Sequence, residues 1–562
     1  MIGKKVKAKE KKKGVNKGLR GNDEEMCESR SPWVKVTLLR RSLVAAFLLV
    51  FLLVLCTAGA SAATTYTVCA SGCDYTSIQA AVNAANPGDT IIVHDGTYTE
   101  NVVVNKSLMI RSQNGAAVTT VQAADTGDIV FYVTADDVTI CGFTVTGATE
   151  GYGIYLDGVQ HCAILNNNAS SNSIGIYLYD SSNNTLTCNT ANYTGYGIFL
   201  YDSSSNTLSG NTANGNGGDG ICLLSMWSSS SNNTLTCNTA NGNGGDGIAL
   251  LDSSSNTLSG NTANGNGGDG ISVSYYWSSG SNNNELSCNT ANGNGEDGIY
   301  LYYSSNNTLS CNTANENGAD NILLHYSSNN NTLTGNDASE GVWYGIQVSY
   351  SSNNTLTGND VSANGWDGIY LWGGSSNNTL TGNNVSANGW AGIHLFTSSN
   401  NSITCNLVAN NVQRGFYLDW GSSGNNTGNT ISNNTIMANG EYNATIGGWE
   451  WNFDNFQSDA VVAEDNYWGT DNSTVIAAGI NENTGTVDYD PFLTDPAPCV
   501  PTDLMPCAST CSGSCPICPV PCYESPGPVP RVPITETATV LMIGLLALAG
   551  CTSVWRQRRS RT

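Results

Sequence analysis

The segment Asn256-Thr-Leu-Ser-Gly-Asn-Thr-Ala-Asn-Gly-Asn-Gly-Gly-Asp-Gly-Ile271 decides the fold, because similar copies recur from about residue 184 to about residue 406. The leucine or isoleucine near the start of each copy falls at positions 186, 208, 235, 258, 286, 309, 333, 356, 380 and 403. The successive spacings are 22, 27, 23, 28, 23, 24, 23, 24 and 23 residues. A near-constant period of this size indicates a solenoid, in which each repeat buries its apolar face only by stacking on its neighbours.

Each repeat contains two short apolar segments, Thr-Leu-Thr and Gly-Ile-x-Leu, whose Leu and Ile side chains must face the core of a β-strand stack. By the same alternation, the second residue after each leading leucine is expected to point inward as well. We therefore expect the cysteines among these residues to be buried small apolar side chains rather than a redox or metal site. The positions are Cys188, Gly210, Cys237, Gly260, Cys288, Cys311, Gly335, Gly358, Gly382 and Cys405.

An asparagine follows each of those ten positions. Identical amides stacked at the strand spacing of about 4.8 Å can hydrogen-bond along a column. The sequence therefore predicts a structural asparagine ladder made of Asn189, Asn211, Asn238, Asn261, Asn289, Asn312, Asn336, Asn359, Asn383 and Asn406.

The segment that precedes the repeats reads as the start of the stack. Residues 77–85 form an amphipathic pattern that predicts a short helix, stopped by Pro87-Gly88, and such a helix would cover the open end of the solenoid. Cys69 and Cys73 are close enough in sequence to bridge within this cap. The strands expected next are Thr90–Val93, Glu100–Val104 and Leu108–Arg111.

Several of these motifs together resemble a known family. They are Tyr75-Thr-Ser-Ile-Gln-Ala-Ala-Val82, Pro87-Gly-Asp-Thr-Ile-Ile-Val93, Gly96-Thr-Tyr-Thr-Glu-Asn101, Asn466-Tyr-Trp-Gly469 and Val487-Asp-Tyr-Asp-Pro-Phe-Leu493. The set resembles right-handed parallel β-helix proteins, including pectin methylesterases at the start and NosD-like surface proteins of archaea over about 75–493. The resemblance implies an all-β, single-stranded right-handed parallel β-helix of about 23 residues per coil with an N-terminal capping helix.

Both ends of the chain indicate export and anchoring. A basic stretch followed by an apolar run and Ser61-Ala-Ala63 predicts a secretory signal, with an uncleaved anchor as the alternative. Ala538–Trp555 is apolar and is followed by four arginines, which predicts membrane attachment. With Pro526-Gly-Pro-Val-Pro-Arg-Val-Pro533 it also resembles the sorting signals processed by exosortase or archaeosortase enzymes. We therefore expect an extracellular protein anchored to the cell surface or membrane.

The expected division of the chain follows from these features. Between the coils and the anchor, a Pro-rich stalk carries six cysteines, for which we favour disulfides over a zinc site at Cys515-Pro-Ile-Cys518. The expected parts are 1–63 basic n-region and signal peptide, 64–140 cap and first coils, 141–440 β-helix repeats, 441–493 last coils and cap, 494–533 stalk, and 534–562 membrane or sorting segment with basic tail.

Charge excludes one class of partner. Between Thr64 and Pro533 there are four Lys and Arg against thirty-nine Asp and Glu, a balance of about −35. Such a surface repels phosphates, so nucleic acid is excluded as a partner and cations or glycans are favoured.

One aspartate precedes the Gly-Ile or Asn-Ile pair in five successive coils: Asp219, Asp246, Asp269, Asp297 and Asp320. Like charges stacked in this way need water or a cation between them. The copy Asn214-Gly-Asn-Gly-Gly-Asp-Gly-Ile-Cys222 resembles the calcium-binding RTX nonapeptide, although here only one copy occurs per coil. Calcium at this column and solvated turn aspartates both stay open as interpretations.

Aromatic side chains alternate with the buried Ile and Leu in several Gly-Ile-x-Leu-x segments. Exposed aromatics in register on a strand face can stack on sugar rings, but they can also simply pack on one another between coils. The predicted carbohydrate-binding residues are Tyr177, Tyr179, Tyr201, Tyr300, Tyr302, Tyr370, Trp372 and Phe396. Among many Asn-x-Ser/Thr sequons, Asn443 and Asn472 are the clearest glycosylation candidates, because the asparagines inside the repeat are expected to serve the ladder first.

Catalysis is the less favoured interpretation. The four histidines, His94, His161, His325 and His394, lie beside no nucleophile and carboxylate by motif, and the pectin methylesterase aspartate motif is absent. Few Met and His residues are available for the copper that the NosD resemblance suggests. The sequence therefore predicts a structural or adhesive surface protein that contacts glycans or surface-layer components. A polysaccharide lyase or glycoside hydrolase on the same fold is the alternative.

Overall fold

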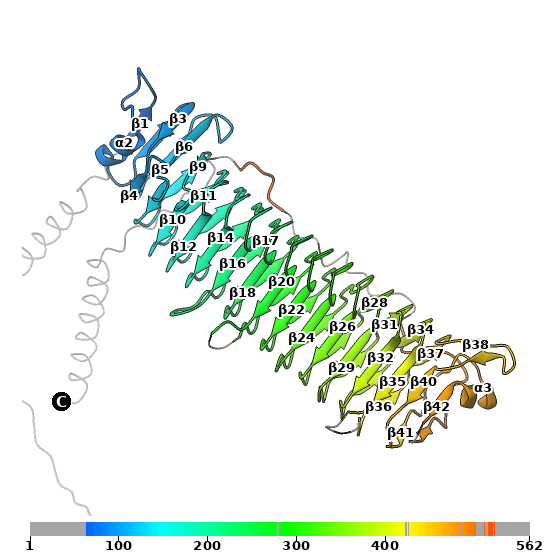
Figure 1. The fold of residues 1–562 in the computed structure, drawn as a ribbon. Coiled ribbons are helices and arrows are strands. Elements are labelled where there is room, and N and C mark those ends of the chain that lie inside the picture. Colours follow the sequence, from blue (N-terminus) through cyan, green and yellow to red (C-terminus); the bar gives the residue numbers. More distant parts are fainter. Residues whose placement is uncertain are drawn as a thin grey trace, which may run out of the picture. The chain divides into compact units, whose positions relative to one another are not determined.

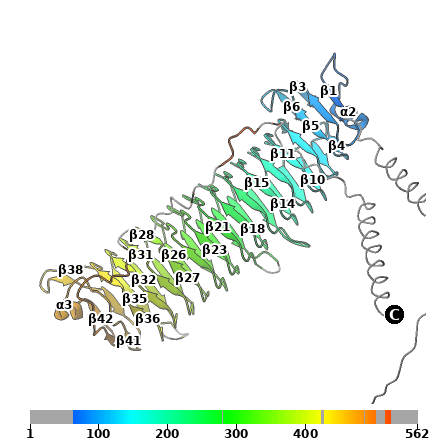
Figure 2. The same ribbon diagram turned by 180° about the vertical axis from the view of Figure 1, so that it is seen from behind.

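The computed structural model describes residues 63–501, 511, 515–520 and 522, apart from residues 278, 279, 422, 423, 425 and 484. The described chain is a parallel β-solenoid, which confirms the predicted fold class. Two sixteen-stranded parallel sheets run along the whole stack, and successive coils follow one another in sequence order (Figure 1). The view from behind shows the same regular order of strands (Figure 2).

The first long sheet contains the Thr-Leu-Thr strands, most of them three residues long. Neighbouring strands pair in register, so that Leu208, for example, aligns with Leu186 and Leu235. Its strands are β1 (Thr65–Val68), β2 (Thr90–Val93), β5 (Met109–Ser112), β8 (Thr139–Cys141), β11 (Ala163–Leu165), β13 (Thr185–Thr187), β15 (Thr207–Ser209), β17 (Thr234–Thr236), β19 (Thr257–Ser259), β21 (Glu285–Ser287), β23 (Thr308–Ser310), β25 (Thr332–Thr334), β27 (Thr355–Thr357), β30 (Thr379–Thr381), β33 (Ser402–Thr404) and β36 (Thr430–Ser432).

The second long sheet contains the Ile-x-Leu strands. Its strands are β4 (Val102–Val104), β7 (Phe131–Val133), β10 (Tyr152–Asp157), β12 (Ile174–Tyr179), β14 (Tyr196–Tyr201), β16 (Ile221–Leu224), β18 (Ile248–Leu251), β20 (Ile271–Ser274), β22 (Ile299–Tyr302), β24 (Ile322–His325), β26 (Ile346–Ser349), β29 (Ile369–Trp372), β32 (Ala391–Phe396), β35 (Arg414–Asp419), β40 (Phe453–Asn455) and β42 (Ile480–Glu482).

Shorter elements close the third side of the coils. They form two small parallel sheets, which isolated bridges from Thr144 through Thr190 and Thr290 to Asp360 connect. The strands are β3 (Gly96–Thr99), β6 (Thr119–Gln122) and β9 (Thr144–Thr146), then β28 (Asp360–Ser362), β31 (Asn384–Ser386), β34 (Leu407–Ala409) and β37 (Thr435–Met437). The pairs β38 (Tyr442–Asn443) with β39 (Gly448–Trp449) and β41 (Val461–Val462) with β43 (Val487–Asp488), and helix α3 (Ser473–Ala478), complete the C-terminal part.

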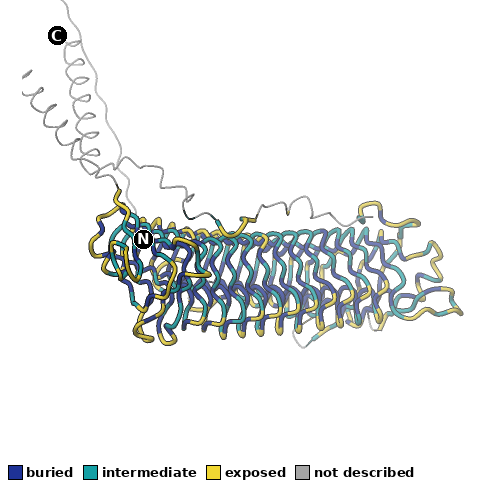
Figure 3. Tube along the Cα trace, turned by 90° about the horizontal axis from the view of Figure 1, so that it is seen from above, coloured by how far each residue is buried: buried dark blue, intermediate teal, exposed yellow. Residues whose placement is uncertain are grey.

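The core is a continuous column of aliphatic side chains inside the coils. Ile198, Leu200, Leu208 and Ala213, which belong to one coil, are all fully buried, and the equivalent residues of the other repeats are buried too. Burying a side chain of the Leu or Ile type contributes roughly 1.5–3 kcal/mol. Buried residues recur along the whole stack (Figure 3). Because each coil covers the apolar side chains of its neighbours, this stabilisation exists only in the stack.

The predicted inward position of Cys188 and its equivalents is wrong. Cys188 has a φ of 55° and Gly210 a φ of 63°, so these residues form left-handed corners directly after the first long sheet rather than continuing the strand. The period-2 alternation ends at such a corner, and the side chain turns outward. All ten positions share this positive φ, which is why glycine is common there and why the cysteines lie only half-buried.

The predicted asparagine ladder is confirmed. The Nδ2 of Asn261 donates to the Oδ1 of Asn289 at 3.0 Å, and Asn238 donates in the same way to Asn261 at 3.0 Å. The Nδ2 of Asn261 also donates to the carbonyl of Leu235 at 2.9 Å. The sharp corners leave backbone groups inside the coil without sheet partners, and these amides satisfy them.

Two further asparagine ladders occupy the other corners of the coil, and the sequence analysis did not separate them. One joins Asn233 to Asn256, and another joins Asn243 to Asn266, each by an amide hydrogen bond of 3.0–3.1 Å. In both ladders a residue with positive φ directly precedes the buried asparagine, for example Asn232 or Gly242. The general rule of this fold is therefore a left-handed residue followed by an inward amide.

Helix α2 (Ile78–Ala84) caps the N-terminal end, as predicted, with Ile78, Ala81 and Val82 buried. Two charged side chains hold its ends. The carboxylate of Glu100 accepts the backbone N–H groups of Ile78 and Gln79, both at 2.9 Å. The ammonium of Lys106 donates to the last carbonyls of the helix, including that of Asn83 at 2.8 Å. These contacts match the helix dipole. The expected Cys69–Cys73 disulfide is present.

Where the structure describes the cysteine-rich tail, it is bonded to the solenoid instead of forming a separate stalk, which corrects the expected division of the chain at this point. Its described cysteines pair with cysteines of the solenoid in reverse order of sequence. The described pairs are Cys405–Cys499, Cys288–Cys511, Cys237–Cys515, Cys188–Cys518 and Cys141–Cys522, and Cys311 is also disulfide-bonded. We refer to the described tail residues between Cys499 and Cys522 as the strap.

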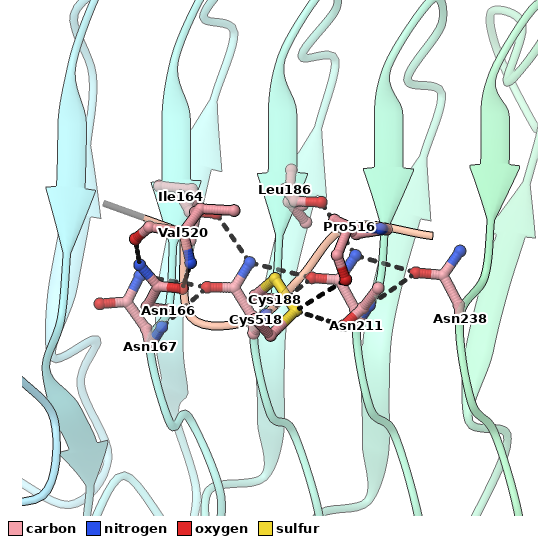
Figure 4. The surroundings of a disulfide bond; sticks show 12 residues. Ile164, Asn166, Asn167, Leu186, Cys188, Asn211, Asn238, Pro516, Cys518 and Val520 are labelled. Carbon is pink, nitrogen blue, oxygen red and sulfur yellow. Dashed lines mark hydrogen bonds between the residues drawn. A yellow bond between two sulfur atoms is a disulfide. The ribbon is translucent and has the colours of Figure 1, made fainter. Parts of the chain in front are cut away.

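The strap lies across the corners that follow the first long sheet, and Figure 4 shows it at Cys188. From Cys515 to Cys518 it advances by three residues while its partners advance by two coils. Three extended residues span about 10 Å, which matches two coils at about 4.8 Å each. Between the bonded coils, a Cβ on Gly210 would lie 2.7 Å from the Cγ of Pro516, so glycine lets the strap pass. Val520 adds a hydrogen bond from its N–H to the Oδ1 of Asn166 at 2.9 Å.

Candidate functional site

The predicted aromatic residues all lie on the outer face of the second long sheet. They occupy positions that alternate with the buried Ile and Leu of strands β12, β14, β22, β29 and β32. Parallel register places the equivalent residues of neighbouring coils directly beside one another, so Tyr177 pairs with Phe199 and Tyr370 with His394. The alternation of the strand therefore predicted their direction correctly.

The first aromatic group covers the N-terminal coils. The rings of Tyr155, Tyr177 and Phe199 stack in a row, with centroid distances of 5.0 and 5.4 Å. Tyr179 and Tyr201 form a parallel row at 5.5 Å. Because the ring faces contact one another, mainly ring edges remain for a ligand here. This arrangement favours packing between coils as the role of Tyr177.

The series of outward aromatic side chains on the second long sheet is interrupted in the middle of the solenoid. Cys222, Ala249 and Ser272 occupy the equivalent positions between Phe199 and Tyr300. The eight predicted residues therefore fall into two groups. The second group is itself divided, because Leu323 and Gln347 lie between Tyr300 and Tyr370. Trp372 and Phe396 lie beside each other on neighbouring strands.

The second group is enlarged by tyrosines that sequence reasoning missed. Tyr303, Tyr326 and Tyr350 lie in left-handed corners directly after the strands, with φ values of 50°, 43° and 50°. Their rings stack at 5.7 and 5.1 Å and are about 40% exposed. In the sequence, each of these residues is a tyrosine that directly precedes Ser-Ser-Asn. Strand alternation alone predicts that this tyrosine points into the core, whereas the left-handed corner turns it outward.

A pocket of about 420 Å³ lies where this group ends. Tyr350, Trp372 and Phe396 supply its aromatic walls, and Gly373, Gly374, Gly421 and Thr397 complete the lining. The Trp372 ring meets the Tyr350 ring edge-on at 4.8 Å. A Cβ on Gly373 would lie 2.5 Å from the Cε1 of Tyr350, so glycine is what allows the ring to lie there. The volume is within the range of small-ligand sites.

Two long turns carry further exposed aromatics. Trp227 is 84% exposed and Trp277 is 70% exposed. Aspartates in the preceding left-handed corners hold these turns, since the Oδ1 of Asp202 accepts the N–H of Met226 at 2.7 Å and the Oδ2 of Asp252 accepts that of Trp277 at 2.6 Å. The spacings of 27 and 28 residues mark these insertions in the sequence. Exposed tryptophans on anchored turns are suited to contact a ligand or another surface.

A histidine and an aspartate meet on the same face as the pocket. The Nδ1 of His394 lies 2.9 Å from the Oδ2 of Asp367. The imidazole is sandwiched between Tyr370 at 4.4 Å and Tyr417 at 4.6 Å. Its Nε2 is buried and has no hydrogen-bond partner among the described residues. No sequence motif marks this pair, because the two residues are 27 positions apart in sequence.

Arginine supplies the positive charge near this pair. The Nε of Arg414 donates to the Oδ2 of Asp454 at 2.7 Å, and its guanidinium lies 4.5 Å from the ring centroid of Tyr417. Burial raises the pKa of Tyr417 and of Tyr370 above that of free tyrosine. Both phenols therefore keep their protons at neutral pH.

The five aspartates proposed as a calcium site form a ladder of their own. The Oδ1 of Asp246 accepts the N–H of Asp269 at 2.8 Å, and the Oδ1 of Asp269 accepts the N–H of Asp297 at 3.0 Å. Asp269, Asp297 and Asp320 are buried, whereas Asp219 and Asp246 are half-buried. Burial, followed by the neighbouring carboxylates, raises the pKa of Asp269 to about 9.

This ladder gives each carboxylate a partner that is not a metal. Burial raises the pKa of Asp246 and Asp320 to about 7. Three ligand atoms from Asp, Glu, His or Cys that lie close together could hold a metal ion. Among the described residues, three such atoms lie within 4.8 Å of one another only at Cys69, Cys73 and His94, and there both sulfurs belong to a disulfide. Calcium binding at the aspartates stays a prediction.

The two glycosylation candidates differ in accessibility. Asn443 is half-buried, and its Nδ2 donates to Glu450, so the atom that would carry a sugar is occupied. Asn472 is exposed and caps helix α3 through its Oδ1, which accepts the N–H of Thr474 at 3.0 Å. Of these two candidates, only Asn472 has an Nδ2 without a hydrogen bond within the described part of the chain.

The expected anchors lie outside the described residues, both the signal segment up to residue 62 and the stretch Ala538–Trp555. Within the part that is described, no helix has the length and apolar character needed to cross a membrane.

The fold and the coil pattern define a solenoid repeat protein of the parallel β-helix class. Six overlapping segments match the family described as the right-handed β-helix region, at residues 58–225, 128–282, 192–338, 224–385, 275–436 and 332–476. The chain belongs to this family.

Similarity to individual proteins is more limited. Over 95 residues the chain is 39% identical to a cell surface glycoprotein of Methanothermus fervidus, a match that covers 16% of this chain and 15% of that protein. Among solved structures, the A-module of the mannuronan C-5 epimerase AlgE6 of Azotobacter vinelandii aligns with a TM-score of 0.44 and 18% identity, covering 63% of this chain and 93% of the module. The catalytic unit of a GH87 α-1,3-glucanase of Streptomyces thermodiastaticus aligns with a TM-score of 0.39 and 15% identity, covering 66% and 69%.

Proposed function

We propose that this chain is a surface-exposed, anchored β-helix protein that binds glycans through the aromatic pocket of Tyr350, Trp372 and Phe396. The observation that carries the proposal is this pocket, in which three aromatic side chains surround glycines on an outward face. Sugar rings present C–H groups that pack on aromatic faces, and their hydroxyl groups need no charged partner. The partial similarity to a cell surface glycoprotein supports the surface location.

The binding face extends beyond the pocket along the solenoid. Tyr300, Tyr302, Tyr303 and Tyr326 continue the aromatic group toward the N-terminal side in coils that follow one another at about 4.8 Å. A row of this kind suits a linear glycan that lies along the stack. The strongly negative ectodomain favours neutral or cation-bridged glycans over acidic ones.

A glycan array with the purified protein tests the proposal. We expect binding to at least one neutral oligosaccharide, and Trp372→Ala should weaken it at least about tenfold, the change that corresponds to about 1.4 kcal/mol. The matched control is Phe199→Ala on the first aromatic group, which removes an outward aromatic from the same sheet and should leave binding unchanged. Equal loss in both variants, or no glycan bound at all, contradicts the pocket as the site.

A second candidate function rests on the pair Asp367 and His394. If the Nδ1–H of His394 donates to Asp367, the unpartnered Nε2 is the basic nitrogen that a general base requires. The rings of Tyr370 and Tyr417, whose phenols are protonated at neutral pH, pack on either side of the imidazole. This arrangement favours a polysaccharide lyase or hydrolase at strands β29, β32 and β35, beside the pocket.

Incubation of the protein with neutral and acidic polysaccharides separates the two functions. New reducing ends or unsaturated products that disappear in His394→Gln would establish an enzyme. The glycan-binding proposal instead expects no product and unchanged array binding in His394→Gln, because the imidazole lies outside the pocket lining.

A further inference from the structure

A row of asparagines follows the corner between the second and the first long sheet. Each lies two residues before a strand of the first long sheet and directly before the buried ladder asparagine. All have φ values between 58° and 61°, which turns the side chain away from the core. The members that carry a Thr or Ser two residues later are Asn183, Asn232, Asn306, Asn330, Asn353, Asn377 and Asn400.

In the repeat sequence, the asparagines of this row stand directly beside the ladder asparagines. In the structure, the row is exposed and the ladder is buried. In Asn306-Asn307-Thr308, Asn307 is the buried ladder residue, whereas Asn306 and Thr308 are exposed. All seven row asparagines are exposed. The side-chain amides of six of them have no hydrogen bond within the described part, and that of Asn183 has one long contact of 3.5 Å, to Gln160.

The turn itself does not require this combination of residues. At the equivalent corners Ser205 and Ser255 adopt φ values of 59° and 60°, so serine fits in place of asparagine. At a further corner Asn283 is followed by Glu285, so threonine is not needed in the strand either. Backbone geometry alone therefore does not explain why seven of the ten corners carry a complete sequon.

We propose that this row is a site of N-linked glycosylation on the protein itself. In the reaction, the Nδ2 of each asparagine forms a bond to C1 of an oligosaccharide. The C1–O bond to the phosphate of a lipid-linked donor breaks, the amide loses one proton, and the lipid phosphate leaves. The free Nδ2 and the nearby hydroxyl two residues later are the groups that a sequon must present.

The row defines one sugar-bearing edge of the solenoid. Parallel register spaces members on successive coils, such as Asn306, Asn330 and Asn353, by about 4.8 Å, so their glycans would stand side by side and cover this part of the edge. Asn353 follows Tyr350 by three residues, and Asn400 follows Thr397 by three, so part of this edge borders the aromatic pocket. Glycosylation of this edge is independent of the proposed binding function and is read out by the mass of the protein.

Glycopeptide mass spectrometry on the full chain, purified from cells that naturally produce it, tests the proposal. We expect sugar-bearing peptides that contain Asn306, Asn353 or Asn377. Thr308→Val, at an exposed position, should remove the modification at Asn306 while leaving that asparagine in place.

Two variants that each create a new sequon in the row provide a second test. Glu285→Thr completes a sequon at Asn283, and Ser205→Asn creates one at position 205, both at exposed corner positions of the same row. Each should add one new glycopeptide. Unmodified row peptides, sugars confined to Asn472, or the same modification at Asn306 in Thr308→Val would each overturn the proposal.

Discussion

Cys522 is disulfide-bonded to Cys141, 381 residues earlier in the chain. The tail is first bonded beside strand β33, through Cys499 and Cys405, and it is bonded to strand β8 at Cys522. The tail therefore ties coils that otherwise contact only their immediate neighbours, and a local opening of one coil is resisted by coils on either side.

Reduction should loosen the solenoid without changing its core. We expect loss of the Cys188–Cys518 bond in a Cys188→Ser, Cys518→Ser double variant to lower stability by about 2–4 kcal/mol, since a cross-link restricts the unfolded chain. Neighbouring bonds keep the closed loop short, so the lower end of that range is expected. Thermal melting of oxidised protein measures the change.

Peptide mapping under non-reducing conditions checks the pairing itself. Tail peptides should be linked to solenoid peptides in reverse order, for example Cys515 to Cys237 and Cys511 to Cys288. Bonds within the tail would contradict the strap.

Stability should fall as pH rises from about 5 to about 8. The pKa of Asp269 is raised to about 9 in the folded chain, whereas that of an unfolded aspartate is about 3.9. The folded state therefore holds protons that the unfolded state has released, and the associated stability is lost as pH rises through this window.

Asp269→Asn removes this titration while retaining the acceptor oxygen for Asp297. We expect it to stabilise the protein at pH 8 by ~1–3 kcal/mol and to have little effect at pH 4, since each pKa unit corresponds to ~1.4 kcal/mol. The control is Asp136→Asn, an exposed carboxylate that accepts the N–H of Gln160 in the same way. Melting curves that are flat between pH 5 and pH 8 would refute the protonated ladder.

Asn261→Ala should destabilise the solenoid strongly. It removes the amide that contacts Asn289, Asn238 and the carbonyl of Leu235, and it leaves buried polar groups unpaired. We expect a loss of about 2–4 kcal/mol, because each buried unsatisfied group costs about 1–3 kcal/mol. Urea unfolding should show this loss and almost none for Thr234→Ala, whose side chain is exposed in strand β17. A similar effect in both variants would argue against the ladder as a stabilising element.

Gly373→Ala should close the pocket from within. The added methyl group would lie 2.5 Å from the Tyr350 ring, so the ring must move. Gly374→Ala introduces the same kind of backbone strain, since both glycines have positive φ, but its methyl group meets nothing within 4 Å. We expect Gly373→Ala to weaken glycan binding about tenfold or more and Gly374→Ala to leave it nearly intact. Fluorescence titration with the best glycan of the array distinguishes the two.

The repeat in the sequence determined the solenoid, its coil length, the inward Ile and Leu residues and the first asparagine ladder. These features follow from a period and an alternation, which are local properties of the chain. The outward direction of Trp372 and Phe396 followed from the same alternation.

Only the tertiary structure decided where the alternation stops. At Cys188 and Tyr350 the backbone turns left-handed, and this turn reverses the side that strand periodicity assigns. The partners of Cys188 and His394 are Cys518 and Asp367, which coil stacking and the returning tail bring close although they are remote in sequence. The sequence predicted Asp269 as a charged member of a column. In the structure its carboxyl is buried, because the packing of the surrounding coils determines how much of a corner is exposed.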